Sequence, residues 1–238
     1  MLHLLLLESA IELVPSRLTA LKDVQSYAGK RGKKPDEVLL DQSYHGRVMT
    51  RLPNHEKRGR PDITFLTLLS VLETPLCKEG LLSVYIHLQD GRIIEVNPEV
   101  RLPRNYDRFI GLMEQLLVEG QVPPTGEPLL TITRSNLEGL LDDLKGDDSV
   151  SILAEEEGER ITLRRLKAMI PEDSSKPVIF GVGAFPHGDL TRETLGLFDE
   201  TVRLDTETMM AWHVSSMMLW LYSEQVAVAD SRFESTPL

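Results

Sequence analysis

The chain has 238 residues, of which 41% are hydrophobic and 26% charged, so it can bury a full core as one large domain or two small ones. Its formal net charge of −11 argues against indiscriminate coating of nucleic acid, because counterion release needs clustered cations. The single Cys77 excludes an internal disulfide framework. The histidine and cysteine spacings of structural zinc sites are missing, so the sequence indicates no metal site. The apolar run at residues 2–7 is far shorter than the roughly 20 residues that cross a bilayer. We therefore expect a cytoplasmic protein without a membrane segment.

The charge is unevenly spread along the chain. Up to residue 108 there are 16 Lys and Arg against 14 Asp and Glu, whereas the remainder has 10 against 23. The first part thus carries +2 and the second −13. This distribution permits one focused basic groove in the first part, while the acidic residues of the second are typical of a solubilising surface.

Strands and helices alternate in the first half of the chain. Periodicity and turn signals predict them in this order: a strand at 2–7, a helix at 15–29, a short buried strand at 38–41, a helix at 61–72, a hairpin of strands at 82–88 and 93–96 that turns at Asp90-Gly91, and a helix at 104–119 that Gly120 ends.

The alternation continues after a proline-rich break at residues 123–128. The predicted elements are a strand at 129–133, a helix at 137–144, a strand at 150–154, a basic helix around 164–167, a strand at 177–183, a short helix, and a final helix at 210–226. Repeated strand and helix alternation predicts an α/β layered fold with a mainly parallel sheet.

Two arginine-rich segments need explaining in an acidic protein. The first, at residues 55–62, contains Arg60 at a predicted helix start, and the second places Arg101, Arg104 and Arg108 around the start of another helix. Guanidinium groups bind phosphate oxygens bidentately and stack on bases, so these four arginines suit RNA. The alternative is a solvated helix face whose arginines pair with neighbouring carboxylates.

Asp62 follows Arg60 by two residues, in the first turn of the predicted helix. Three roles are open to it: a favourable charge at the helix N-terminus, a partner of Arg60, or a general base. The histidines share no spacing, and no serine lies in a nucleophile elbow. Hydrolase chemistry therefore has no support.

The segment at residues 181–189 follows a buried strand, where parallel sheets bind ligands. Gly183 and Gly188 would let the backbone approach a flat ligand such as a nucleoside, and the loop at 202–210 could close over it. The spacing matches neither a dinucleotide fingerprint nor a phosphate-binding loop, so a tight turn without a ligand is the alternative. The final helix is apolar around most of its circumference, which predicts burial in a core or a dimer interface.

Several of these segments together resemble the ribosome-biogenesis pseudouridine N1-methyltransferases of small-subunit rRNA, which belong to the SPOUT superfamily. The resemblance is carried by residues 57–62, 97–109, 111–113 and 183–188, and it extends from about residue 2 to residue 226. It implies a SPOUT-type α/β fold with a mainly parallel sheet and a C-terminal trefoil knot that binds S-adenosylmethionine. It also implies one domain over residues 1–238, with a family-specific hairpin and helix extension at about 82–120.

The resemblance also assigns site residues by position. Arg60, Arg101, Arg104 and Arg108 match the family's rRNA-contacting arginines, and Asp62 matches the aspartate that holds the first of them. The third cofactor segment lacks the aromatic residue and proline that many relatives carry. The cofactor is expected between Leu153 near the first knot segment, Gly183 and Gly188 in the second, and Leu204, Asp205, Thr206, Glu207, Thr208 and Met209 in the third.

The function that the resemblance implies is methylation of N1 of a pseudouridine in small-subunit rRNA, by in-line attack on the sulfonium methyl of S-adenosylmethionine. It further implies a homodimer that assists small-subunit biogenesis without a metal, in the cytoplasm or, in a eukaryote, in the nucleolus. One alternative is a non-catalytic assembly factor that binds pre-rRNA and retains the pocket. Another is a SPOUT methyltransferase that acts on tRNA or on another rRNA base.

Overall fold

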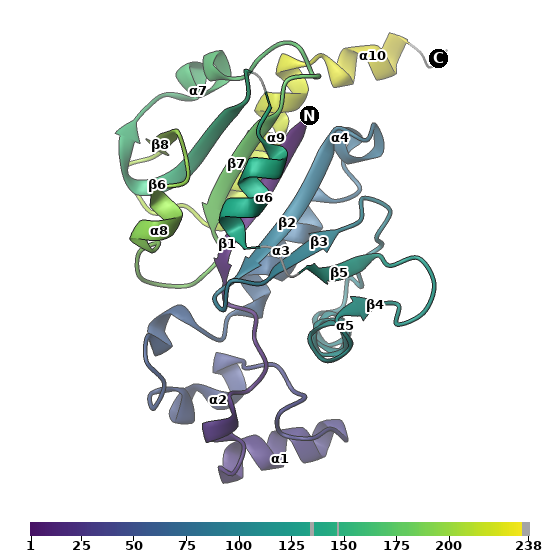
Figure 1. Ribbon diagram of the computed structural model, residues 1–238, viewed down its shortest axis with the longest axis vertical. Coiled ribbons are helices and arrows are strands. Elements are labelled where there is room, and N and C mark those ends of the chain that lie inside the picture. Colours follow the sequence, from purple (N-terminus) through teal and green to yellow (C-terminus); the bar gives the residue numbers. More distant parts are fainter. Residues whose placement is uncertain (134–135, 147, 235–238) are drawn as a thin grey trace.

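The computed structural model describes residues 1–133, 136–146 and 148–234. Within these residues the strands are β1 (Leu2–Ser9), β2 (Leu82–Leu88), β3 (Ile93–Val96), β4 (Gln121–Val122), β5 (Leu130–Thr133), β6 (Val150–Arg160), β7 (Val178–Gly183) and β8 (Glu200–Arg203). They form one sheet in the order β4-β5-β3-β2-β1-β7-β6-β8 (Figure 1). β2, β1, β7, β6 and β8 are parallel, and β3, β5 and β4 are antiparallel. The predicted mainly parallel α/β sheet is confirmed.

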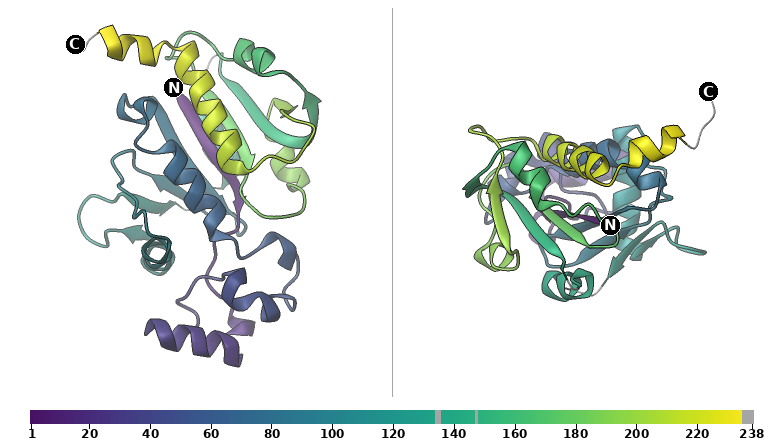
Figure 2. Two further views of the ribbon diagram at one scale, coloured as in Figure 1. Left: turned by 180° about the vertical axis from the view of Figure 1, so that it is seen from behind. Right: turned by 90° about the horizontal axis from the view of Figure 1, so that it is seen from above.

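Helices cover both faces of this sheet. α3 (Pro61–Val71), α5 (Tyr106–Glu119) and α9 (Ala211–Gln225) pack on one face, and α6 (Leu137–Leu144) packs on the other (Figures 1 and 2). The other helices of the described chain are α1 (Lys22–Arg31), α2 (Gln42–Met49), α4 (Pro75–Lys78), α7 (Leu163–Met169), α8 (Arg192–Leu195) and α10 (Val228–Glu234). None of the helices in the described ranges is long and apolar enough to cross a membrane.

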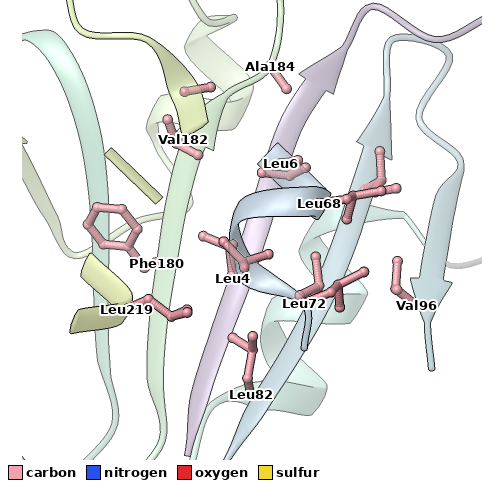
Figure 3. Close-up of a cluster of buried hydrophobic side chains, with 14 of the residues drawn as sticks. Leu4, Leu6, Leu68, Leu72, Leu82, Val96, Phe180, Val182, Ala184 and Leu219 are labelled. Carbon is pink, nitrogen blue, oxygen red and sulfur yellow. The ribbon is translucent and has the colours of Figure 1, made fainter. Parts of the chain in front are cut away.

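β1 forms the centre of the core because its leucines alternate between the two faces. Leu4 and Leu6 point to the side of α3 and α9, where they join Leu68 and Leu219 (Figure 3). Leu5 belongs to the cluster on the α6 side. All of these side chains are almost fully buried. Fully burying a leucine side chain contributes roughly 1.5–3 kcal/mol, so the predicted buried strand at residues 2–7 contributes substantially to the stability of the core.

A small lobe at residues 14–58 lies between β1 and α3 in the chain and beyond one end of the sheet in space (Figure 1). Its own apolar cluster contains side chains from α1 and α2. The expected helix at 15–29 begins only at Lys22, because a 3₁₀ turn follows Pro15 and Leu21 is extended. The expected strand at 38–41 is buried but has no strand neighbour apart from one bridge to Leu13, and Asp41 instead caps α2.

The lobe is fixed to α5 by two buried polar contacts. Glu114 of α5 is fully buried and accepts hydrogen bonds from Arg31 (3.1 Å), Lys33 (2.8 Å) and the backbone N–H of Leu39 (3.1 Å). At the start of α5, the Tyr106 hydroxyl donates to Asp41 Oδ2 at 3.0 Å. The Glu114 carboxylate of α5 thus accepts hydrogen bonds from the lobe, and the Asp41 carboxylate of the lobe accepts one from α5. These contacts fix the position of the lobe relative to α5.

Candidate functional site

A cavity of about 550 Å³ lies where β7 and β8 end, beside Ala154 of β6. This is the carboxyl edge of parallel strands, where open α/β sheets bind ligands. The N-terminal end of α3 contributes Arg60 and Ile63. The remaining walls are formed by residues 154–156 of β6, 182–183 and 185–190 after β7, 202–205 and 207–210 after β8, and Ala211, Trp212 and Val214 of α9.

The lining combines an apolar part with an acidic rim. Val182, Leu190 and Val214 are buried and apolar, and the rim carries more carboxylates than cations. The carboxylates belong to Glu155, Glu156, Asp189, Asp205 and Glu207, and the cations to Arg60 and Arg203. Such a cavity favours a ligand that has one flat apolar portion and a net positive charge.

Most of the residues expected around a cofactor line this cavity. They are Gly183, Gly188, Leu204, Asp205, Glu207, Thr208 and Met209. Two of the expected residues do not reach it. Thr206 is exposed outside the cavity, and Leu153 is fully buried in the cluster on the α6 side, because alternation along β6 turns the next residue, Ala154, toward the cavity instead.

The loop after β8 is shaped by its own hydrogen bonds. Arg203 donates from Nε to the carbonyl of Asp205 (2.9 Å) and from Nη2 to that of Thr206 (2.8 Å). The Glu207 N–H donates to Asp205 Oδ1 (3.0 Å), which lowers the pKa of that carboxyl. Thr208 donates to Glu156 Oε1 (2.8 Å) and so attaches the loop to β6. These hydrogen bonds join the loop to Arg203 and to β6 and so define the shape of this wall.

The turn after β7 brings backbone close to the cavity. An added Cβ at Gly183 would lie 3.0 Å from the ring of Phe185, so glycine allows the aromatic ring to lie against the strand end. Gly188 has φ +94°, a conformation that residues with side chains rarely adopt. Ala184 exchanges backbone hydrogen bonds with Leu7 (2.9 Å) and Ala10 (3.0 Å), which ties the turn to β1.

Arg60 and Asp62 form a bidentate ion pair at the mouth of the cavity. Arg60 Nε donates to Asp62 Oδ1 and Arg60 Nη2 to Asp62 Oδ2, each at 2.7 Å. The hydrogen bonds with Asp62 raise the pKa of the Arg60 guanidinium. Both carboxylate oxygens therefore face the guanidinium, and Asp62 holds the arginine in one orientation.

Lys57 and Glu8 form a buried pair whose importance the sequence alone does not indicate. Glu8, the penultimate residue of β1, has φ +48° and accepts hydrogen bonds from Lys57 and from the hydroxyls of Thr191 and Thr194. Burial favours the neutral acid, yet these hydrogen bonds lower the pKa of the Glu8 carboxyl below its ordinary value. Lys57 also lies 4.1 Å from the centre of the Phe185 ring. The pair thus links the lobe, β1 and the turn that lines the cavity.

The three arginines of the second segment do not line the cavity. Arg101, Arg104 and Arg108 are all exposed at the entrance and first turn of α5. Arg104 makes a long contact of 3.8 Å with Glu73, and neither Arg101 nor Arg108 forms an ion pair with any residue that the structure describes. The geometry therefore does not favour the alternative in which these arginines pair with neighbouring acidic residues.

The comparisons with known proteins agree with this arrangement. The model of the EMG1/NEP1 methyltransferase family matches residues 4–222, which is most of the chain. The chain belongs to this family. Two relatives named ribosomal RNA small subunit methyltransferase Nep1 are each 42% identical to it over 219 residues. The protein from Staphylothermus marinus matches over 92% of this chain and 93% of its own, and that from Thermococcus kodakarensis over 92% and 96%.

A solved structure of another EMG1/NEP1 family member has the same fold. The crystal structure of Archaeoglobus fulgidus Nep1 bound to S-adenosylhomocysteine superposes with a TM-score of 0.81 at 37% identity. The match covers 94% of this chain and 98% of that one. The expected family and its α/β fold are thereby confirmed. Across residues 1–133, 136–146 and 148–234 no cluster of three potential metal ligands is found.

Proposed function

We propose that this EMG1/NEP1 family member transfers a methyl group from S-adenosylmethionine to N1 of a pseudouridine in small-subunit rRNA. The observation that carries the proposal is the position of Arg60, which lines a nucleoside-sized cavity and is held by Asp62 at its mouth. A guanidinium group that can bind a phosphate thus adjoins a cavity large enough for the cofactor. The relatives' names and the S-adenosylhomocysteine in the Archaeoglobus structure support the same reaction class.

The residues of the cavity fit S-adenosylmethionine. The cofactor carries a sulfonium and an ammonium group against one carboxylate, and the rim carries five carboxylates against two arginines. Val182, Leu190 and Val214 offer an apolar surface for an adenine ring, and the volume lies within the range of roughly 300–1,000 Å³ that is usual for small-molecule sites. When bound, the cofactor supplies a methyl group activated by the positive sulfur.

The chain's own residues then do positional work. Arg60 binds a phosphate beside the target nucleotide and directs its base toward the cavity, while Arg101, Arg104 and Arg108 hold the surrounding RNA by charge. Holding two reacting atoms at near-attack distance supplies on the order of 7–11 kcal/mol in ideal cases. No strong new charge develops on the protein side, because the sulfonium charge disappears during transfer.

The nitrogen that attacks must lose its proton, and the geometry does not favour Asp62 as the acceptor. Both of its oxygens already accept hydrogen bonds from Arg60. We assign Asp62 the role of positioning Arg60 and expect water to take the proton. With Asp62→Asn, RNA affinity should fall at all pH values. An Asp62→Asn variant that kept full RNA affinity but transferred methyl only at high pH would establish a base role instead.

The decisive measurement is methyl transfer to small-subunit rRNA hairpins that differ only in carrying pseudouridine or uridine at the target. We expect transfer to the pseudouridine hairpin alone, and equal activity on both would refute N1 specificity. A calorimetric titration with S-adenosylmethionine accompanies the assay. RNA binding without cofactor binding would favour a non-catalytic assembly factor.

We also propose that the protein is a homodimer. In the single chain α9 is not buried on all sides, since Trp220 remains 58% exposed and Leu66 and Leu69 of the adjacent α3 are each 38% exposed. Exposed aromatic and leucine side chains on neighbouring helices are typical of an interface. Light scattering should give a dimer for the wild type and a monomer for Trp220→Glu. A monomeric wild type at micromolar concentration would contradict the proposal.

A further inference from the structure

One side of α2 carries a cationic and aromatic surface that the proposed function leaves unused. Tyr44, Arg47 and Arg51 follow one another at steps of three and four residues, so they share one side of α2 and of the turn that continues it. We refer to these three residues as the α2 face. Tyr44 is 53% exposed, and both arginines are exposed. Neither arginine has an ion-pair partner in the part of the chain that the structure describes.

The ring of Tyr44 is held in place from beneath. It packs against Tyr27 with ring centres 4.4 Å apart and an angle of 32° between the planes. The ring centre of Tyr27 in turn lies 4.9 Å from that of His45, in a T-shaped arrangement, and 5.7 Å from the central carbon of the Arg31 guanidinium. A large, partly exposed aromatic ring with a fixed orientation is suited to stacking on a flat ligand, because little side-chain freedom is lost on binding.

The start of α2 is attached to the segment that carries Arg60. The backbone N–H of Gln42, at the start of α2, donates to the carbonyl of Gly59 at 2.8 Å, and Gly59 directly precedes Arg60. Gly59 has φ +67°, and an added Cβ there would lie 3.2 Å from the backbone N of Gln42, so the start of α2 packs tightly against the residue before Arg60. Asp41, the cap of α2, also accepts the hydrogen bond from Tyr106 of α5. The helix that carries the α2 face is therefore attached at its start to the residue before Arg60.

We infer that the α2 face is a second RNA-binding surface, which contacts nucleotides that flank the target nucleotide. Tyr44 stacks on a base, and Arg47 and Arg51 bind phosphates. Aromatic side chains next to arginines are the combination with which proteins bind single-stranded nucleic acid. The three residues span about 10 Å along the helix, enough for a few phosphates. The inference rests on the proposed function, because it extends the path of the same RNA beyond Arg60.

Fluorescence anisotropy with two hairpins tests the inference. Both carry the same pseudouridine loop and closing pairs, but one, the long hairpin, also keeps single-stranded nucleotides on both flanks, whereas the other is trimmed to the loop and its closing pairs. Arg47→Ala and Arg51→Ala should each weaken binding of the long hairpin about fivefold and reduce the slope of log K against log salt by about 0.9. Tyr44→Ala should weaken it about tenfold. Tyr44→Phe should bind as the wild type, because the stacking ring is retained.

The trimmed hairpin and a matched arginine provide the controls. All α2 variants should bind the trimmed hairpin with wild-type affinity, and Arg164→Ala, which removes an exposed arginine from α7, should bind both hairpins normally. Melting temperatures confirm that each variant folds. Wild-type affinity of the α2 variants for the long hairpin would overturn the inference and leave an acidic protein as the partner. Absent methyl transfer by the wild type would instead refute the proposed function.

Discussion

The two arginine-rich segments look alike in the sequence and differ in the structure. In the first, Lys57 and Arg58 have only 13% and 16% of their side chains exposed and form ion pairs with Glu8 and Glu12. In the second, Arg104 is 85% exposed, and its contact with Glu73 is long. One segment has its charge neutralised within the protein, and the other keeps its charge available to a partner.

From this difference we expect RNA contacts where a cationic side chain keeps donors that no internal carboxylate engages. The Lys57 and Arg58 ion pairs hold the lobe against the end of β1, whereas the side chains of Arg101 and Arg108 form no ion pair within the described residues. Arg60 is intermediate, because Nε and Nη2 are bound to Asp62, whereas Nη1 makes no hydrogen bond within the described residues. Asp62 therefore fixes the orientation of Arg60, and Nη1 stays available to bind a phosphate.

The largest expected effect is on stability, in the first segment. Lys57→Ala leaves the buried Glu8 carboxylate without its cation, and breaking a buried pair in this way costs about 3–5 kcal/mol. Arg101→Ala, the matched removal of one cation in the second segment, should change stability by less than about 0.5 kcal/mol. Urea denaturation of both variants measures the difference. Equal urea midpoints would show that the two segments do not differ in their contribution to stability.

The converse effect is on RNA affinity, in the second segment. Replacing Arg101, Arg104 and Arg108 together by alanine should weaken rRNA binding by about 2 kcal/mol, or on the order of 30-fold, and reduce the salt slope by about 2–3. The urea midpoint should stay at the wild-type value. Anisotropy titrations at several salt concentrations test this. Unaltered affinity would mean that exposure alone does not make these arginines a binding surface.

A double-mutant cycle sharpens the comparison inside the first segment. Arg58 donates to Glu12 through Nε at 2.6 Å and also through Nη2, and both side chains are partly exposed. Arg58→Ala, Glu12→Ala and the double variant should give a coupling free energy of about 1 kcal/mol. The same cycle on Arg104 and Glu73 should give a value near zero. A larger coupling there would show that the second segment is also tied internally.

The smallest expected effect is the acid dependence of the Glu8 pair. The folded-state pKa of Glu8 is lowered, so its contribution to stability is full above the unfolded-state value near 4.3 and is lost as pH falls through the lower folded-state value. Glu8→Gln should remove this part of the acid dependence while leaving the curve above pH 6 parallel to that of the wild type. Thermal melts between pH 3 and 7 measure it, and identical acid limbs would contradict the assignment.

Local patterns predicted most of the elements. Pro61 at the first position of α3, Asp90-Gly91 between β2 and β3, and Gly120 at the end of α5 all act through backbone preferences of single residues, and each has the expected place. The helix α2 was not predicted, because its eight residues include Gly46 and depend on the Asp41 cap and on packing against Gly59.

The site was predictable in position but not in detail. Gly183 and Gly188 follow a strand and line the cavity, as the sequence pattern indicates, whereas Leu153 points to the opposite face of the sheet. The role of Glu8 depends on Lys57, Thr191 and Thr194, which are distant in sequence, so no local signal could have revealed it. The trefoil knot, which the resemblance implies, and the cytoplasmic location, which is expected from the composition, stay predictions.

The lobe at residues 14–58 leaves the sheet after β1 and returns to it at α3, and the Glu8 and Glu12 ion pairs bring its two ends together at one point. Away from these ends, Glu114 and Tyr106 on α5 form hydrogen bonds with the lobe. We therefore expect that this segment can be exchanged as a unit between relatives. A chimera that carries a relative's lobe together with those few anchor positions should keep its sheet and cofactor cavity and inherit the donor's choice of flanking RNA, so evolution could retarget this scaffold without rebuilding its chemistry.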